Sequence, residues 1–306
     1  MQTEFSAAAS AAQPKADKKQ RFKRMLPKIV LYVILIFLAV LWLIPFLFAL
    51  STSFAYQFNI NDGESVVGIY HKDYNWLWHT ITFDNYSRLF SEYNILGGFM
   101  NTILYMLAPL FVGVFTSAMA AYAFARLRFP GRDVIFFILL STILLPGVIT
   151  MIPSYILFAT FYNWTNTPLP LIIPGCFGSA MTMFLIRQYF LGFPKELEEA
   201  AQIDGMGWWG IFVKIALPLS MPVLITQIIL SFNGIYNDYL GPLLYVGTVT
   251  DLRTLQLVLK SIPTVGNTPY PLMMAGAIVA LIPTFILYCV AQKFFVEGIV
   301  LSGIKG

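Results

Sequence analysis

The sequence predicts an all-α membrane protein with six transmembrane helices. Hydrophobic residues make up 58% of its 306 positions, charged residues only 11%, and the mean hydropathy is +0.72. Six apolar runs approach the length that an α-helix needs to cross a hydrocarbon core of roughly 30 Å. A soluble protein of this size would not need six such runs, so we expect a multi-pass membrane protein. The predicted spans cover 29–50, 99–123, 134–158, 169–186, 215–235 and 272–292.

The N-terminal segment differs in composition from the rest of the chain. Residues 1–27 are polar and rich in alanine and lysine, which predicts a disordered tail before a single transmembrane domain at 28–306. The apolar run that follows is too long for a cleavable signal peptide, and no small-residue cleavage site ends it. The first span is therefore expected to be an uncleaved anchor.

Two of the spans carry features of their own. The second has small residues at every fourth position, Gly113, Ser117, Ala121 and Ala125, which lets another helix approach closely. We interpret this face as packing. The third contains Pro146, Gly147 and Pro153 in its middle, which predicts either an ordinary proline kink or a partly unwound span beside protein or a polar path.

The segment 187–214 between the fourth and fifth spans is charged and reads as a short cytoplasmic helix. Pro194 suits the first helical turn, and the glutamates after it favour the positive end of a helix dipole. Gly205 suits the left-handed residue that ends a helix. An apolar helix with Trp208 and Trp209 follows, and Pro218 then interrupts the entry into the fifth span. On physical grounds alone, this segment could also be an interfacial amphipathic loop.

The distribution of Lys and Arg predicts that both termini face the cytoplasm, because these residues favour the inner side of a membrane. With the N-terminus inside, 15 of the 19 basic residues are cytoplasmic and four are outside. The four outside residues are Lys72, Arg88, Arg253 and Lys260. The net charge of +4 is thus explained by topology, and no nucleic-acid partner is needed.

The chain shows no pattern for chemistry or for an energy source of its own. Its spans contain essentially no ionisable groups, apart from Asp238 near an outer end, although ion-coupled carriers need them. A phosphate-binding loop is absent. The two histidines, His71 and His79, lie in the outside loop without a metal-ligand pattern. We therefore expect no catalytic site, no metal site and no cofactor in this chain, so a transport function must take its energy from a partner.

The cytoplasmic segment resembles one family closely. Glu199-Ala200-Ala201, then Asp204-Gly205, then Ile215-x-Leu217-Pro218 are similar to the "EAA" loop of the permeases of ABC importers. Three further stretches resemble the smaller permease subunit of the carbohydrate branch, whose best-known members import maltose and oligosaccharides. These stretches are AYAFARLRFPGR at 121–132, YNDYLGPLLY at 236–245 and the C-terminal FFVEGIVLSGIKG.

The resemblance implies the type I ABC importer permease fold in a bacterial inner membrane, and a larger complex. In that family, a second homologous permease, two ATPase subunits that bind ATP and Mg, and an extracytoplasmic solute-binding protein complete the importer. The cytoplasmic helix is a coupling helix that moves with the ATPase dimer and drives alternating access. The implied coupling residues are Glu198, Glu199, Ala200, Ala201, Asp204, Gly205 and Pro218.

A polar and aromatic group near the outer end of the fifth span is a candidate substrate path. Amides and a carboxylate can bond sugar hydroxyls, and aromatic faces can stack on sugar rings, although the same residues could form an interfacial belt. The candidates are Gln227, Asn233, Tyr236, Asn237 and Asp238. We expect import of a sugar or oligosaccharide. The alternatives are a polyol or glycerol-phosphate importer, a self-contained secondary carrier and, third, a membrane-embedded enzyme.

Overall fold

The computed structural model describes residues 18–55, 81–262 and 270–303. Within these ranges the regular structure is helical, and one isolated antiparallel bridge joins Ala55 to Ile81. Hydrophobic helices of this length satisfy their own backbone polar groups, as a membrane requires. The predicted all-α class is therefore confirmed.

Four helical segments are long and apolar enough to cross a membrane: Met25–Ser53, Ile95–Arg126, Leu169–Leu191 and Tyr270–Gln292. Two further pairs of helices are each long and apolar enough if the two bent helices of a pair are taken as one span. The described residues then contain up to six candidate spans. The first pair, Arg132–Leu144 with Gly147–Phe161, bends by 98°, and the second, Trp208–Leu219 with Met221–Tyr236, bends by 75°. The predicted interruptions by proline thus become sharp bends.

The predicted tail at 1–27 is too long at its C-terminal end. Helix α1 spans Lys18–Ser53 and includes Pro27, whereas residues 1–17 lie outside the described part of the chain. Lysine, arginine and glutamine are good helix formers, so the basic segment extends the apolar helix instead of ending before it.

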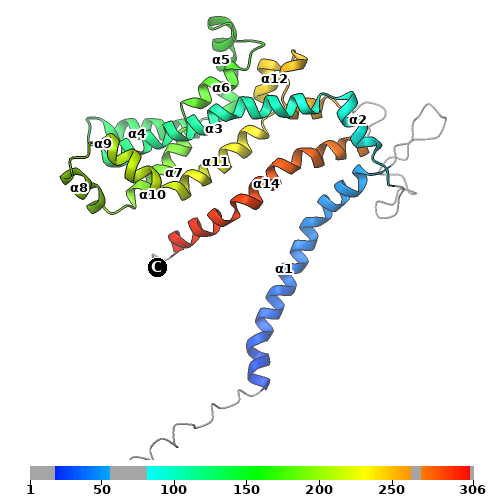
Figure 1. The fold of residues 1–306 in the computed structure, drawn as a ribbon, viewed down its shortest axis with the longest axis horizontal. Coiled ribbons are helices and arrows are strands. Elements are labelled where there is room, and N and C mark those ends of the chain that lie inside the picture. The colour runs from blue at the N-terminus through cyan, green and yellow to red at the C-terminus, as the bar shows by residue number, and fades with distance from the viewer. Residues whose placement is uncertain (1–17, 56–80, 263–269, 304–306) are drawn as a thin grey trace, which may run out of the picture.

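Helix α3 (Ile95–Arg126) runs through the bundle with α11 (Met221–Tyr236) along it, and α14 (Tyr270–Gly303) packs against α11 (Figure 1). Helix α2 (Asp84–Glu92) lies at one end of α3. The segment that the sequence predicts to be cytoplasmic lies at the other end (Figure 1). It contains α8 (Glu196–Ile203), α9 (Trp208–Ile211), a π-helical turn (Phe212–Ala216) and α10 (Leu217–Leu219).

The remaining helices lie around α3 and α11. They are α4 (Arg132–Ser141), α5 (Gly147–Ile156), α6 (Leu169–Cys176), α7 (Ala180–Leu191), α12 (Leu240–Val246) and α13 (Leu255–Lys260). Short 3₁₀ or π turns occupy Thr142–Leu144, Leu157–Phe161 and Thr250–Leu252. One buried cluster joins α3 to α7 and the cytoplasmic segment, and a second joins α3 to α2, α11, α13 and α14.

The small-residue face of α3 packs where the sequence predicted. A Cβ on Gly113 would overlap the carbonyl oxygen of Gly175, so the backbones of α3 and α6 are in direct contact. Ser117 is buried and its hydroxyl accepts a hydrogen bond from the Ser179 backbone N–H at 3.1 Å. Ala121 is fully buried. The face therefore serves close helix packing, as small residues do in membranes.

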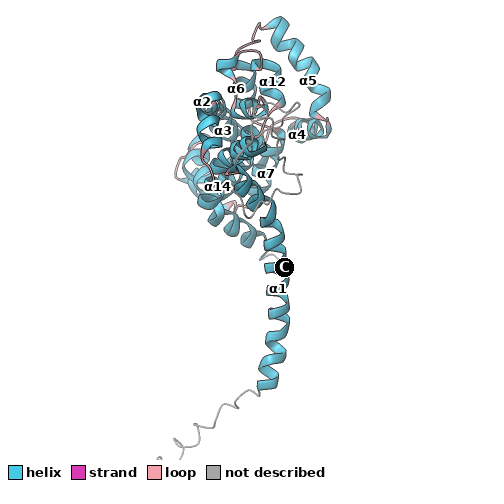
Figure 2. Ribbon diagram, turned by 90° about the vertical axis from the view of Figure 1, so that its right-hand side faces the viewer, coloured by secondary structure: helices cyan, strands magenta, loops and turns pink. Residues whose placement is uncertain are grey.

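Helix α1 extends away from the other helices and meets α14 near the end that carries α2 (Figures 1 and 2). Its apolar side chains are exposed along most of its length. Near its C-terminal end, α1 is held by the buried Asn85 side chain, which donates hydrogen bonds to the carbonyls of Ser53 (3.0 Å) and Ala55 (2.8 Å). These carbonyls have no partner within the helix, so Asn85 acts as their cap.

Replacing Asn85 with alanine is expected to lower the free energy of unfolding by about 1–3 kcal/mol, because two buried carbonyls lose their donors. The measurement is thermal unfolding of the detergent-solubilised protein. Ser91→Ala, on the exposed side of α2, is the matched control. Equal melting temperatures for the two variants would contradict the role of Asn85.

Candidate functional site

Helix α8 has a defined beginning and end. Three glutamates occupy its first turn, where negative charge stabilises the helix dipole. Gly205 follows the helix with φ of +80°. The Met206 N–H donates to the Ala201 carbonyl (2.9 Å) and the Gly205 N–H donates to Gln202 (3.0 Å). These bonds form a Schellman motif, so the predicted left-handed ending at Gly205 is confirmed.

One side of α8 faces the protein and the other faces outward. Ala201 is only 3% exposed and packs in the cluster with α3 and α7, and Glu198 is buried beside it. Leu197, Ala200 and Asp204 are exposed, and Ile203 is 86% exposed. Of the two alanines among the implied coupling residues, Ala200 thus faces outward and Ala201 faces the bundle. The inward face carries a glutamate, and this charge concealed the amphipathic pattern.

Glu198 forms an ion pair with Arg126 at the end of α3. The Arg126 Nε lies 3.1 Å from Glu198 Oε1, and the two side chains are 5% and 11% exposed. Burial raises the pKa of the Glu198 carboxyl above its ordinary value, while the positive charge of Arg126 acts in the opposite direction. Arg126 also donates through Nη2 to the carbonyls of Phe190 (2.6 Å) and Phe193 (2.9 Å).

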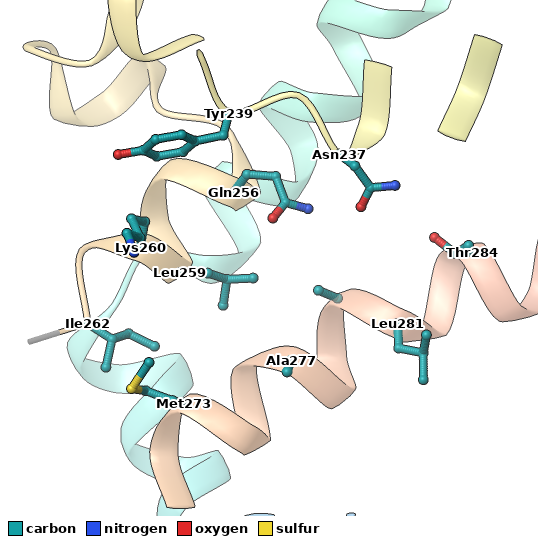
Figure 3. A pocket seen from close by; sticks show the side chains of 11 residues that line it. Asn237, Tyr239, Gln256, Leu259, Lys260, Ile262, Met273, Ala277, Leu281 and Thr284 are labelled. Atoms are coloured by element: carbon teal, nitrogen blue, oxygen red, sulfur yellow. The ribbon is translucent and has the colours of Figure 1, made fainter. Parts of the chain in front are cut away.

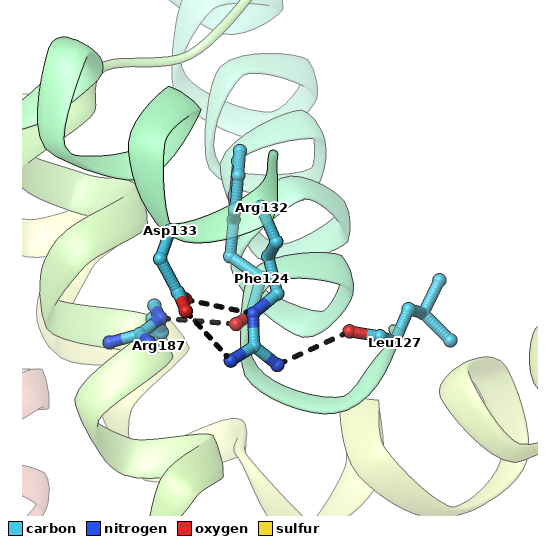
Figure 4. Close-up of polar contacts among 5 residues, drawn as sticks. All are labelled: Phe124, Leu127, Arg132, Asp133 and Arg187. Atoms are coloured by element: carbon cyan, nitrogen blue, oxygen red, sulfur yellow. Dashed lines mark hydrogen bonds and ion pairs between the residues drawn. The ribbon is translucent and has the colours of Figure 1, made fainter. Parts of the chain in front are cut away.

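Other arginines bind helix ends nearby (Figure 4). Arg187 donates through Nε to the Phe124 carbonyl at 3.2 Å and stacks over the Phe136 ring, 4.0 Å from its centroid. Arg132 pairs with Asp133 and donates to the Leu127 carbonyl. Cations at the carboxyl ends of helices complement the dipole, so this end of the bundle is fixed by positive charge. A cleft of about 820 Å³ lies between these arginines and α8, lined by residues including Arg128, Lys195, Glu199 and Trp208.

The segment after α8 leads into the fifth span. Trp208 and Trp209 are half-exposed, whereas Ile211 and Phe212 are buried, as in a helix that rests on the bundle with one face. Pro218 is exposed in the short α10, and the chain turns by 75° between Leu219 and Met221. The predicted break in this region is confirmed.

The five predicted path residues do not all lie on one surface. Tyr236 is 1% exposed and its hydroxyl donates to the Ala280 carbonyl at 2.9 Å, and Gln227 is also buried. Asn233 and Asn237 are exposed and bonded to each other at 2.8 Å. Asp238 is exposed and accepts a bond from the Gly241 N–H. Two of the five predicted path residues therefore face the core.

A cavity of about 610 Å³ lies between α11, α13 and α14 (Figure 3). Asn237 contributes an amide to it, and the sequence analysis missed its other polar lining, Gln256, Lys260 and Thr284. Gln256 and Lys260 lie four residues apart on α13, whereas Thr284 lies on α14, so only the fold brings all three to one cavity. A smaller cavity of about 240 Å³ includes Asp238, Tyr105 and Thr254.

The greater part of the chain matches a known protein family. Residues 113–299 match the family described as "Binding-protein-dependent transport system inner membrane component". The matched part includes α8 and the whole of α11. The chain belongs to this family. The permease is thus an inner-membrane component of the ABC transporter class, and the predicted resemblance to permeases of carbohydrate ABC importers is confirmed.

Similar permeases cover most of the chain. The maltodextrin transport system permease protein MdxG of Bacillus subtilis is 32% identical, over 92% of this chain and 98% of that protein. The arabinooligosaccharides transport system permease protein AraQ of Halalkalibacterium halodurans is 33% identical, over 74% and 81%. A crystal structure of a bacterial ABC transporter involved in the import of the acidic polysaccharide alginate aligns with a TM-score of 0.74 and 24% identity. It covers 92% of this chain and 100% of that chain, so the ABC importer permease fold is shared.

Proposed function

We propose that this permease imports a sugar or oligosaccharide, delivered by an extracytoplasmic binding protein and driven by ATP hydrolysis in two partner ATPase subunits. The observation that carries the proposal is α8. It is a charged helix, fixed at its C-terminal end by the Gly205 turn, with an outward face of Leu197, Ala200 and Asp204 at one end of the bundle. An exposed face on a firmly seated helix suits docking of a cytoplasmic protein.

The division of roles on α8 follows from which residues are accessible. Glu199, Ala200 and Asp204 are exposed and are proposed to contact the ATPase, which holds ATP and Mg. Glu198 and Ala201 are buried and are proposed to pass the movement inward. Gly205 sets the turn, and Pro218 begins the bend into α11. In this scheme, movement of α8 drives alternating access of the spans.

The proposal that the solute is a sugar is supported by the names of the relatives and by the polar lining of the 610 Å³ cavity. Relatives of this chain are named for maltodextrin and arabinooligosaccharides. The amides of Asn237 and Gln256 and the Thr284 hydroxyl in the cavity can bond sugar hydroxyls, and a neutral sugar needs no counter-charge. A second permease subunit is proposed to complete the path and to cover the exposed α1. Both termini are proposed to be cytoplasmic, as the basic residues favour.

A second candidate is an anionic solute such as a glycerol phosphate. It is favoured by one residue, Lys260, which lines the same cavity and whose ammonium group could pair with a phosphate.

The test is affinity purification of the tagged chain in mild detergent, followed by reconstitution of the recovered complex with its binding protein. We expect a second permease and an ATPase to co-purify, and ATP-dependent uptake of a neutral oligosaccharide. Uptake of glycerol phosphate instead would favour the second candidate. A chain that purifies alone and accumulates sugar without ATP would be a secondary carrier and would contradict the proposal.

A further inference from the structure

We infer that Arg126 is a positioning residue that joins the coupling helix to two transmembrane helices at once. This inference rests on the proposed role of α8 and adds the route by which its movement enters the membrane. Through Glu198, Arg126 holds α8. Through the Phe190 and Phe193 carbonyls, it holds the end of α7 and the turn that follows. Arg126 is itself the last residue of α3.

Arg126 makes two kinds of contact, and their energies differ in how strongly they depend on the angle between the groups. The bonds from Nη2 to the two carbonyls, at 2.6 and 2.9 Å, are directed hydrogen bonds. The contact from Nε to Glu198 is an ion pair at 3.1 Å and not an aligned hydrogen bond. Coulomb attraction depends on distance more than on angle. Arg126 therefore stays fixed on α7, while α8 can tilt without losing its attachment.

The environment of Glu198 leaves Arg126 as its main partner. The Tyr122 hydroxyl on α3 is buried and makes no hydrogen bond within the described residues. Lys195, at the N-cap of α8, also acts on the Glu198 carboxyl but is exposed. A carboxylate buried among the apolar residues of this cluster needs a paired cation, so Arg126 provides a charged attachment for α8 in addition to the apolar packing of Ala201.

A buried ion pair contributes little to stability, because the cost of removing two charges from water offsets their attraction. Apolar residues could hold α8 on the bundle as firmly. An arginine does something that they cannot, since its planar guanidinium donates in several fixed directions. One side chain can thus link α3, α7 and α8, and a force on α8 reaches both spans together.

The test is the number of solute molecules transported per ATP hydrolysed by the reconstituted importer, with and without Glu198→Gln. We expect this ratio to fall by roughly fivefold or more, the usual size of coupling between two sites, in a complex that still assembles. Glu196→Gln removes the same charge from an exposed position of the same helix and should keep the wild-type ratio. An assembled Glu198→Gln complex with the wild-type ratio would overturn the inference.

A second variant covers the case in which Glu198→Gln does not fold, since it leaves the Arg126 charge buried without a counter-charge. The double substitution Arg126→Leu with Glu198→Leu removes both charges and keeps the site apolar. Assembly with a lowered transport ratio supports the inference, and assembly with full coupling overturns it. Failure of the proposed function is separate, because it would appear in the wild-type sample as the absence of a co-purifying ATPase.

Discussion

Gly178→Ala is expected to destabilise the permease by roughly 2–5 kcal/mol, through backbone strain and overpacking together. Gly178 lies in the turn between α6 and α7 and has φ of +78°, a conformation that side chains with a Cβ rarely adopt. An added Cβ would overlap the Ser117 hydroxyl and would lie 2.9 Å from the Gly113 carbonyl oxygen. The neighbour is the backbone of a long helix, which cannot move aside at low cost.

The measurement is the loss of monodisperse protein on heating in detergent, followed by size-exclusion chromatography. Gly131→Ala is the matched control because Gly131 also has a positive φ, +77°, but its added Cβ would meet only the Ile135 side chain at 3.8 Å. The control should lose stability by the strain alone, about 1–2 kcal/mol. Equal losses in the two variants would show that the close approach of the turn to α3 adds nothing.

The contact around Gly178 also shows what the sequence could predict and what it could not. The face of Gly113, Ser117 and Ala121 on α3 follows from a period of four residues, and the structure confirms it. Its partner does not follow from any period. The predicted span 169–186 lies within the candidate span Leu169–Leu191, but the helix in it is interrupted at Phe177–Ser179, between α6 and α7. A single turn with Gly178 gives no hydrophobic periodicity, so only the three-dimensional packing identifies it.

The candidate site also has features that local sequence signals predict and features that depend on residues distant in the chain. The end of α8 depends on a local signal, Gly205, and the sequence predicted it. The beginning was predicted at Pro194, whereas the helix begins at Glu196, after the N-cap residue Lys195. The inward face of α8 depends on Arg126, some 70 residues earlier in the chain, and could not be predicted locally. Tyr236 illustrates the limit on α11. A tyrosine beside Asn237 suggested a polar surface, but its hydroxyl is satisfied by the α14 carbonyl of Ala280. Side-chain direction on a helix is thus decided by its neighbours.

Gly205→Val is expected to uncouple ATP hydrolysis from transport. Gly205 has φ of +80°, and no atom lies within 4 Å of an added Cβ, so the substitution causes no overlap. Its cost is the left-handed backbone conformation, about 1–2 kcal/mol for a residue with a Cβ and more for a β-branched one. A cost of this size shifts the equilibrium about 5- to 30-fold away from the Schellman turn that ends α8.

The consequence of losing this turn is specific to coupling. Without the bonds from Gly205 and Met206 to Gln202 and Ala201, the C-terminal end of α8 frays, and its movement no longer reaches α9 and α11. ATPase activity in the reconstituted importer should then persist while solute uptake falls. Gly205→Asn is the matched control, because asparagine tolerates the left-handed conformation and should retain most of the uptake. Wild-type uptake by the valine variant in an intact complex, or equal losses in both variants, would show that the backbone at Gly205 does not set the coupling.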